Sequence, residues 1–169
     1  SDKTGTLTEN KMTMTKSHSF VEPEKLFEFF TLASHGRSPV EKAIYHYADE
    51  QSYPVKKWWK KFPLIDEIPF DSKRKRMTTI HSFSGGLRCI TKGAPEILLS
   101  RCTKILTKEG EKPLSSLQKK HLGDILQMYA GDALRVLAIG YRDLPKTAPS
   151  SVHKNCDNDL IFVGFAAFM

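Results

Sequence analysis

The first residues of the chain, Asp2-Lys3-Thr4-Gly5-Thr6-Leu7-Thr8, combine residue types that can carry out chemistry at phosphorus. A carboxylate at a turn can attack a phosphorus centre and form an aspartyl phosphate. Lys3 supplies positive charge, and Gly5 allows backbone N–H groups to approach a phosphate closely. Judged by spacing alone, a solvated N-terminal turn explains the same residues and is the more frequent case. Both interpretations stay open at this point.

Positive charge is the second feature with chemical consequences. The 169 residues contain 26 Lys and Arg against 19 Asp and Glu, which gives a formal net charge of +7. Basic residues gather at 56–61 (KKWWKK) and at 73–76 (KRKR). Such a surface favours an anionic partner such as phosphates, nucleic acid or lipid head groups, although runs of charge are most often solvated faces.

In the first third of the chain, the elements that must position these residues are mostly helices. Residues 6–15 alternate roughly and predict a strand or an extended connector. Apolar residues at helical spacing predict a helix that Pro23 opens and Gly36 ends. A second helix begins at Ser38-Pro39-Val40-Glu41, which reads as a capping box with Pro at the first helical position. The basic residues 56–61 are expected to form an exposed turn.

The rest of the chain predicts strands with interspersed helices. Period-two patterns indicate strands at 62–70, 77–83, 87–91, 103–107, 134–143 and 160–168, with a hairpin at Gly85-Gly86. A helix starts at Ala94, and a longer one follows Ser115. The apolar face of the longer helix is predicted to hold Leu117, Leu122, Ile125, Met128 and Tyr129. Residues 145–158 are expected to form a polar loop. The fold class expected is α+β, with a twisted, largely antiparallel sheet flanked by helices.

Composition limits the protein classes that fit. The chain is 40% hydrophobic and 27% charged, an ordinary balance for one globular domain over 1–169, and this excludes a disordered chain. The longest apolar run, 160–169, is too short for a bilayer span, which needs about 20 residues. Three cysteines without CxxC spacing argue against a scaffold held by disulfide bonds. No signal peptide is recognised, so the expected setting is water, on the reduced side of a membrane.

Four segments together resemble the P-type ATPases, ion pumps that pass through an aspartyl phosphate. DKTGTLT at 2–8 resembles their phosphorylation signature, and FDSKRKRM at 70–77, KGAPE at 92–96 and LRVLA at 134–138 follow in the family's order. The heptapeptide is also similar, more loosely, to phosphatases of the haloacid dehalogenase type. Those carry a second Asp two residues after the nucleophile as general acid and base, where this chain has Thr4. That difference favours a pump over a phosphatase.

The resemblance implies a set of nucleotide-binding residues. It gives Phe70 as the ring that stacks on adenine and Lys75 as the contact to phosphate. Lys92, Gly93 and Ala94 match the pocket motif, and Arg135 and Leu137 match a strand of the pocket wall. ATP needs an apolar slot and cations, which agrees with these residue types. Without the resemblance, Phe70 reads as a core aromatic, Lys92 as a solvated strand end, Gly93 as a helix cap and Arg135 as a surface residue.

Two positions depart from the family's pattern. A Glu near the adenine amino group usually follows Gly by four residues, whereas Glu41 follows Gly36 by five. The capping box also explains Glu41, so contact with adenine and capping both remain possible. Ser72 stands where several relatives have Arg, which can weaken ribose and phosphate contacts. Lys73, Arg74 and Arg76 are expected to contribute a positive electrostatic field rather than direct contacts to the phosphates.

The resemblance also implies a larger protein around this chain. Asp2 would be the phosphorylated nucleophile, with Lys3 and Thr4 beside it, and Asp2 and Thr4 would hold Mg²⁺ only together with a phosphorylation domain. We expect 1–15 and 159–169 to be hinge strands toward that domain, in one polypeptide with actuator and transmembrane domains. The chain would then be a cytoplasmic domain of an integral membrane ion pump, with calcium the leading choice of ion. Alone, it is expected to be monomeric, to bind ATP or ADP weakly and not to turn over.

Two other functions remain as alternatives. A stand-alone phosphatase of the haloacid dehalogenase type would need a parallel-sheet core and a downstream acidic loop. A basic nucleic-acid-binding module could use Trp58 and Trp59 to stack on bases. No nucleic-acid motif accompanies these tryptophans, and ATP would itself need a basic patch, so no nucleic-acid partner is expected.

Overall fold

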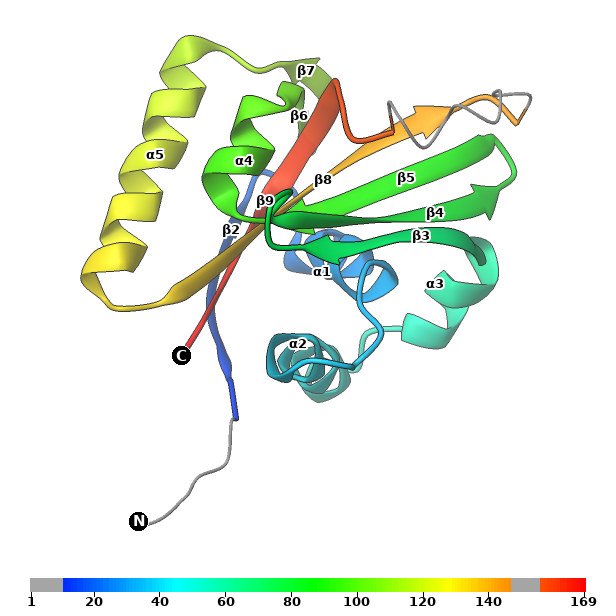
Figure 1. The fold of residues 1–169 in the computed structure, drawn as a ribbon, viewed down its shortest axis with the longest axis horizontal. Coiled ribbons are helices and arrows are strands. Elements are labelled where there is room, and N and C mark those ends of the chain that lie inside the picture. The colour runs from blue at the N-terminus through cyan, green and yellow to red at the C-terminus, as the bar shows by residue number, and fades with distance from the viewer. Residues whose placement is uncertain (1–10, 147–155) are drawn as a thin grey trace.

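The computed structural model describes residues 11–146 and 156–169, and its centre is one mixed sheet of eight strands (Figure 1). The strand order is β3-β4-β5-β8-β9-β6-β7, and β2 also pairs with β9. Every strand pair is antiparallel except β6 with β9. The elements, in chain order, are β2 (Met14–Ser19), α1 (Pro23–Leu32), α2 (Pro39–Glu50), α3 (Val55–Lys61), β3 (Leu64–Asp71), β4 (Arg76–Phe83), β5 (Gly86–Gly93), α4 (Pro95–Ser100), β6 (Cys102–Thr107), β7 (Gly110–Pro113), α5 (Ser116–Gly131), β8 (Arg135–Leu144) and β9 (Leu160–Phe168). The predicted α+β class with a largely antiparallel sheet is confirmed.

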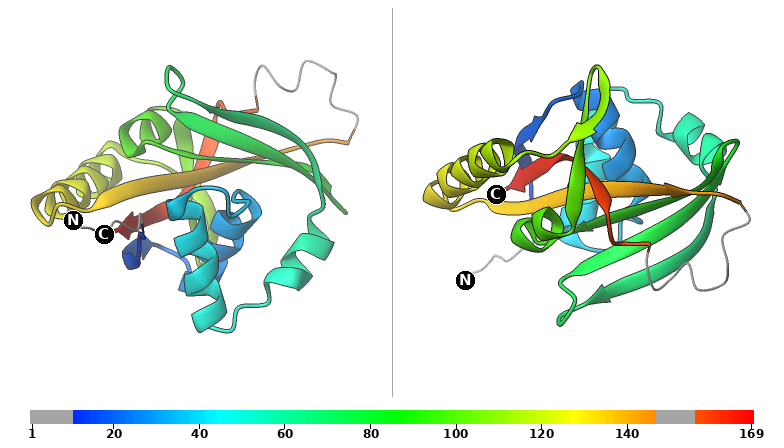
Figure 2. Two further views of the ribbon diagram at one scale, coloured as in Figure 1. Left: turned by 60° about the horizontal axis from the view of Figure 1, so that its bottom comes forward. Right: turned by 90° about the horizontal axis from the view of Figure 1, so that it is seen from above.

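Helices cover both faces of the sheet, and a hydrophobic core lies under each layer. The left view of Figure 2 shows α1, α2 and α3 together on one side of the sheet. Their apolar side chains pack on sheet residues such as Ile90 and Ile139. On the other face, α4 and α5 pack against Ala138 and Phe162. Adjacent residues of β8 thus serve opposite cores, as the alternation of side chains along a strand requires.

Strand β9 lies in the middle of the sheet, and all nine of its residues are buried. Strand β8 runs along one side of it, while β6 and β2 share the other side. Gly164 allows the close approach of β2, because a Cβ there would lie 2.6 Å from the carbonyl oxygen of His18. Thr13 and Met169 exchange backbone hydrogen bonds of 2.9 and 3.0 Å. The two ends of the described chain therefore lie side by side.

Local signals in the sequence position the starts of the helices as predicted. Pro23 is the first residue of α1. Ser38 caps α2 by accepting a hydrogen bond from the backbone N–H of Glu41. Ser115 and Gln118 form both bonds of a capping box at the start of α5. Each cap satisfies N–H groups that the first turn of a helix leaves unpaired.

Several local predictions were wrong. Residues 56–61 belong to the helix α3 rather than to a turn, because Trp58 is buried in the core under α1. Helix α1 ends at Leu32, before Gly36. On α5, Leu117 and Met128 are 78% and 64% exposed, because the helix packs on the sheet through its other apolar residues. Strand β7 has only the four residues GEKP, which show no alternation of apolar and polar side chains, so the sequence did not predict it. No helix among the described residues is long and apolar enough to cross a bilayer.

Candidate functional site

A cavity of about 830 Å³ opens where the β3–β4 turn, the end of β5 and the starts of α2, α4 and β8 meet. This volume lies within the range of about 300–1,000 Å³ that is typical of small-molecule sites. The cavity wall contains every residue that the resemblance assigned to a nucleotide pocket, namely Glu41, Phe70, Lys75, Lys92, Gly93, Ala94, Arg135 and Leu137. The structure thus brings together residues that are up to 96 positions apart in the sequence.

One part of the cavity wall contains a buried ion pair. Lys92 Nζ donates to Glu41 Oε2 at 2.6 Å and to Ser34 Oγ at 2.7 Å. Glu41 Oε1 accepts hydrogen bonds from the backbone N–H groups of His35 at 3.1 Å and of Arg37 at 3.0 Å. The carboxylate of Glu41 is therefore bound to Lys92 and does not close the predicted capping box, although Ser38 does cap the helix. Lys92 is buried in this pair, so the alternative interpretation of Lys92 as a solvated strand end is wrong.

Burial and charge act against each other in this pair. Burial pushes the pKa of Glu41 up, but the Lys92 ammonium and the hydrogen bonds to both carboxylate oxygens outweigh burial and hold that pKa below its ordinary value. Burial lowers the pKa of Lys92, and the neighbouring Glu41 carboxylate counteracts part of that effect. Both side chains are buried, and each satisfies the charge of the other, which is the condition under which buried charges are tolerated.

Other lining side chains of the cavity are exposed. Phe70 is 62% exposed and presents its ring to the cavity, so it is not the core aromatic that its position in a strand would suggest. Lys75 and Arg135 are also exposed. Within the part of the chain that the structure describes, neither cation has a hydrogen bond or an ion pair of its side chain. They are therefore available to an anion, unlike Lys92.

Gly93 has a role that the sequence did not indicate. A Cβ at this position would lie 2.4 Å from the carbonyl oxygen of Lys75 and 2.7 Å from the Cα of Arg76. The same Lys75 oxygen accepts a hydrogen bond of 3.1 Å from the backbone N–H of Ala94. Gly93 thus allows the end of β5 to touch the β3–β4 turn while it also lines the cavity, and the N-cap of α4 is Ala94 rather than Gly93. This contact fixes Lys75, whose backbone φ of 56° is left-handed.

The sequence analysis missed several residues of the site. Glu67 lines the cavity and accepts a hydrogen bond of 2.8 Å from Arg37, which also lines it. Ser34 supports Lys92 from the end of α1. Arg74 and Arg76 form ion pairs with Asp157 behind the turn, so they make specific contacts rather than only a field. These partners are 30 to 83 residues apart, and no local pattern in one sequence signals such pairs.

The residues proposed for phosphorylation, Asp2, Lys3 and Thr4, lie outside the described residues. Within 11–146 and 156–169, no group of three or more His, Cys, Asp or Glu side chains is arranged to hold a metal ion. The cavity itself has four cationic side chains and three carboxylates in its wall, from Arg37, Lys75, Lys92, Arg135, Glu41, Glu67 and Glu96. Such a wall can hold an organic anion with an apolar part, because Val40, Phe70 and Leu137 lie beside the charges.

Comparison with known families agrees with this architecture. The family model described as P-type ATPase, cytoplasmic domain N, matches residues 24–169, and the chain belongs to this family. A calcium-transporting ATPase of Listeria monocytogenes is 31% identical over 99% of this chain, and one of Lactococcus lactis is 30% identical over 99% of it. A third, from Bacillus cereus, is 28% identical over the whole chain. The chain spans only 22%, 21% and 21% of these three relatives.

Proposed function

We propose that this domain binds ATP in the cavity between the β3–β4 turn and the starts of α2, α4 and β8. The observation that carries the proposal is the convergence of one exposed aromatic ring, two exposed cations without an ion pair among the described residues, and a buried ion pair on a cavity of about 830 Å³. A nucleotide needs an apolar surface for its base and cations for its phosphates. The cavity offers both.

The base is proposed to lie against Phe70 and the buried pair of Lys92 and Glu41. Phe70 supplies the face on which it stacks, and Leu137 shields it from water. The ammonium of Lys92 has three protons, of which Glu41 and Ser34 take two. Each oxygen of the Glu41 carboxylate has two acceptor positions, and Oε2 uses one for Lys92. The pair therefore keeps one donor and one acceptor for a ligand, which suits the amino group and a ring nitrogen of adenine.

The phosphates are proposed to lie near Lys75 and Arg135. Both cations are exposed and have no ion pair within 11–146 and 156–169, so they can follow the phosphates without breaking a described contact. Exposed charges contribute modestly, and association itself costs entropy. We therefore expect weak binding by this domain alone, with a Kd on the order of 0.1 to several mM.

In the intact protein, the proposed role is that of the nucleotide-binding part of an ATP-driven ion pump in the membrane. Movement of the domain as one body toward a phosphorylation domain would bring the γ-phosphate of ATP to Asp2, and positioning would supply most of the rate. Bound Mg²⁺ would neutralise phosphate charge there, held by Asp2 and Thr4 with residues of a phosphorylation domain. The relatives are calcium-transporting ATPases by name, so calcium is the ion proposed.

The test is a titration of the domain with ATP, followed by amide NMR shifts, on the wild type and on Phe70→Ala and Lys75→Ala. Stacking on an aromatic ring is worth roughly 1–3 kcal/mol per base, so Phe70→Ala should weaken binding about 5- to 150-fold. Matched controls are Leu117→Ala, an exposed apolar residue on α5, and Lys73→Ala, a cation in the same turn that does not line the cavity. Both controls should bind ATP within twofold of the wild type.

The result of the titration decides whether the proposal is supported or refuted. Saturable binding in the millimolar range, with shifts around Phe70, Lys92 and Arg135, supports it. A folded wild-type domain that shows no shifts at about 10 mM ATP would refute it, since that concentration exceeds the expected Kd. Equal losses in Phe70→Ala and Leu117→Ala would mean that the ring of Phe70 does not carry the binding.

The two alternative functions find less support in the arrangement of residues. A phosphatase of the haloacid dehalogenase type has a parallel-sheet core, whereas the described sheet contains only one parallel pair, β6 with β9. Stacking of nucleic acid on both tryptophans of α3 conflicts with the burial of Trp58. Arg74 and Arg76, half of the second basic cluster, are engaged by Asp157. Turnover of p-nitrophenyl phosphate or salt-dependent binding of an oligonucleotide would revive either alternative.

A further inference from the structure

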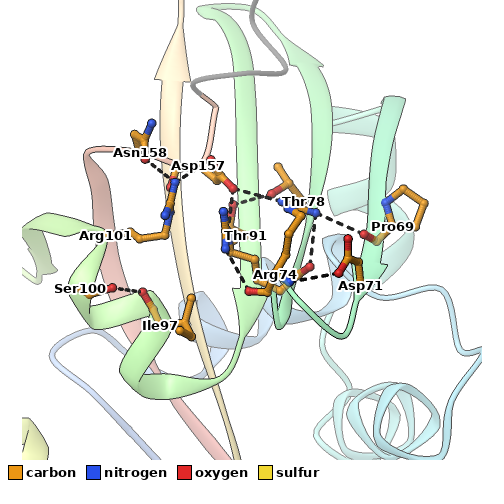
Figure 3. A network of polar contacts seen from close by, with 11 residues as sticks. Pro69, Asp71, Arg74, Thr78, Thr91, Ile97, Ser100, Arg101, Asp157 and Asn158 are labelled. Carbon is orange, nitrogen blue, oxygen red and sulfur yellow. Dashed lines mark hydrogen bonds and ion pairs between the residues drawn. The ribbon is translucent and has the colours of Figure 1, made fainter.

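A buried carboxylate lies behind the β3–β4 turn, on the side away from the cavity. Asp157 Oδ2 accepts hydrogen bonds from Arg76 Nε at 2.7 Å and from Arg74 Nη2 at 3.1 Å. Arg101, at the end of α4, donates to Asp157 Oδ1 at 3.3 Å and to the Asp157 carbonyl oxygen at 2.8 Å. Figure 3 shows Arg74 and Arg101 reaching Asp157 from different elements. One carboxylate thus joins the turn, α4 and the segment before β9.

Three guanidinium groups around one carboxylate leave that carboxylate firmly ionised. Burial pushes the pKa of Asp157 up, but hydrogen bonds from Arg76 and Arg74, with the charges of Arg76 and Arg101, outweigh burial and hold that pKa below its ordinary value. Charge-assisted bonds of this kind are stronger than neutral ones. The contact is therefore a firm attachment rather than a loose surface pair.

The turn connects this attachment directly to the cavity. Side chains alternate along a strand, so Arg76 points to Asp157 while Lys75 and Met77 line the cavity on the opposite side. Arg74 also donates from Nη1 to the carbonyl oxygen of Pro69 at 3.3 Å, and Pro69 directly precedes Phe70. The same guanidinium thus links Asp157 to the backbone beside the ring.

The turn needs such support because β3 is an edge strand. Among the described strands only β4 pairs with β3, and most residues of β3 and of the turn are partly or fully exposed. Lys75 also holds a left-handed backbone conformation, which a lysine rarely adopts. On the cavity side, the bond from Ala94 N–H to the Lys75 oxygen holds the turn. On the far side, Asp157 holds it through Arg74 and Arg76.

We propose that Asp157 is a positioning residue of the cavity, which fixes Phe70 and Lys75 for the nucleotide through Arg74 and Arg76. This inference rests on the proposed function, because it assumes that the cavity binds ATP. Asp157 touches no part of the cavity itself and acts only through the turn. Loss of the attachment should leave the fold in place and weaken ATP binding, because the ring and the ammonium would no longer be held in one arrangement before ATP binds.

The main test compares two variants with the same change of charge. Arg74→Gln removes the bonds to Asp157 and Pro69, while Lys73→Gln removes a neighbouring cation that has no ion pair within the described residues. Asp157 keeps Arg76 and Arg101 in Arg74→Gln, so this variant should fold. Residues that share one network commonly couple strongly, so we expect ATP to bind about tenfold more weakly to Arg74→Gln and within twofold of the wild type to Lys73→Gln.

A second comparison separates positioning from general loss of stability. Asp157→Asn should weaken ATP binding at least as much as Arg74→Gln does. Leu122→Ala removes a buried side chain of α5, away from the turn, and should lower the free energy of unfolding without changing the Kd. In Lys75→Ala, which keeps the ring of Phe70, Arg74→Gln should weaken ATP binding less than it does in the wild type. That non-additivity is the signature that a purely structural role does not produce.

The outcomes distinguish the two proposals. If the wild type does not bind ATP, the proposed function fails and this inference fails with it. If the wild type binds ATP but Arg74→Gln binds as well as Lys73→Gln, the positioning role is wrong and the proposed function stands. If Leu122→Ala loses affinity as Asp157→Asn does, stability explains the loss and the positioning role is again wrong. Should Asp157→Asn fail to fold, the comparison of Arg74→Gln with Lys73→Gln still decides.

Discussion

Removing one partner of the buried ion pair between Lys92 and Glu41 should destabilise the domain strongly. Lys92→Met keeps the length of the side chain but leaves the Glu41 carboxylate without its cation, 2.6 Å away in the wild type. Breaking a buried pair by removing one partner costs about 3–5 kcal/mol. In a domain of this size, each kcal/mol shifts the Tm by about 2–4 °C, so we expect a fall of roughly 6–20 °C.

The pH dependence gives this prediction its sharpest form. In the wild type, the pKa of Glu41 is depressed, so its contribution to stability is present above the unfolded pKa and is lost as the pH falls through the folded pKa. In Lys92→Met the ammonium is gone, and burial is opposed only by the hydrogen bonds from the backbone N–H groups of His35 and Arg37, so the pKa of Glu41 should lie higher than in the wild type. The folded variant then binds the proton more readily than the folded wild type does, and it loses less stability as the pH falls. The difference in the free energy of unfolding between the two proteins should therefore be larger at pH 7 than at pH 4.

The assay is urea unfolding at both pH values, followed by the fluorescence of the buried Trp58 and by circular dichroism. Glu41→Gln and the double variant complete a double-mutant cycle. Since the charges need each other, the double variant should be destabilised by clearly less than the sum of the two single variants. A cost of Lys92→Met below about 1 kcal/mol at pH 7 would refute the reasoning, because exposed pairs are worth that much. So would a cost that is the same at pH 7 and pH 4.

Three further predictions follow from single contacts. Gly93→Ala should lower the free energy of unfolding by about 1–3 kcal/mol in urea, because its Cβ would press on the Lys75 carbonyl oxygen. As a control, the Cβ of Gly123→Ala on α5 meets no atom within 4 Å, so this change should be neutral or stabilising. Burial lowers the pKa of His81 to about 4, so the free energy of unfolding should fall by about 3 kcal/mol as the pH falls from 6.5 to 4. In His81→Gln this fall should be smaller by the same amount. Parallel pH profiles of stability for the two proteins would contradict this. If ATP binds through the exposed Lys75 and Arg135 as proposed, salt should weaken its binding more than that of adenosine. Equal salt dependence in calorimetric titrations would place the phosphates elsewhere.

Helix starts and most strands could be predicted because their signals are local. Ser115 with Gln118, and Ser38 with Pro39, are complete within four residues, and the structure has a helix at each. The strands around Gly85-Gly86 follow from period-two alternation and a hairpin turn. The helix α3 was missed because its run of lysines reads as solvated, whereas the burial of Trp58 is decided by α1, far away in the chain. Tertiary packing thus overrode a local pattern.

The candidate site divides in the same way. The residues of the cavity wall could be named in advance only because the motifs at 70–77, 92–96 and 134–138 resemble a family. Their individual roles could not be read from the sequence. The engagement of Lys92 by Glu41 joins residues 51 positions apart, and that of Arg74 by Asp157 joins residues 83 positions apart. Gly93 was given a role toward a ligand, because nothing local shows that the Lys75 backbone lies against it.

For the proposed ATP site, the location of Phe70 and Lys75 at an edge hairpin meets two opposing requirements. A side chain that binds a ligand must be exposed before binding, and edge strands provide that exposure. Edge strands are also the least supported part of a sheet. If the turn were not held in place, it would have to become ordered on binding, and the entropy lost would weaken the affinity. Gly93 and Ala94 hold the turn on the cavity side, and Asp157 holds it from behind. Because both supports act on the backbone or on neighbouring arginines, the ring and the ammonium stay exposed while their base is fixed.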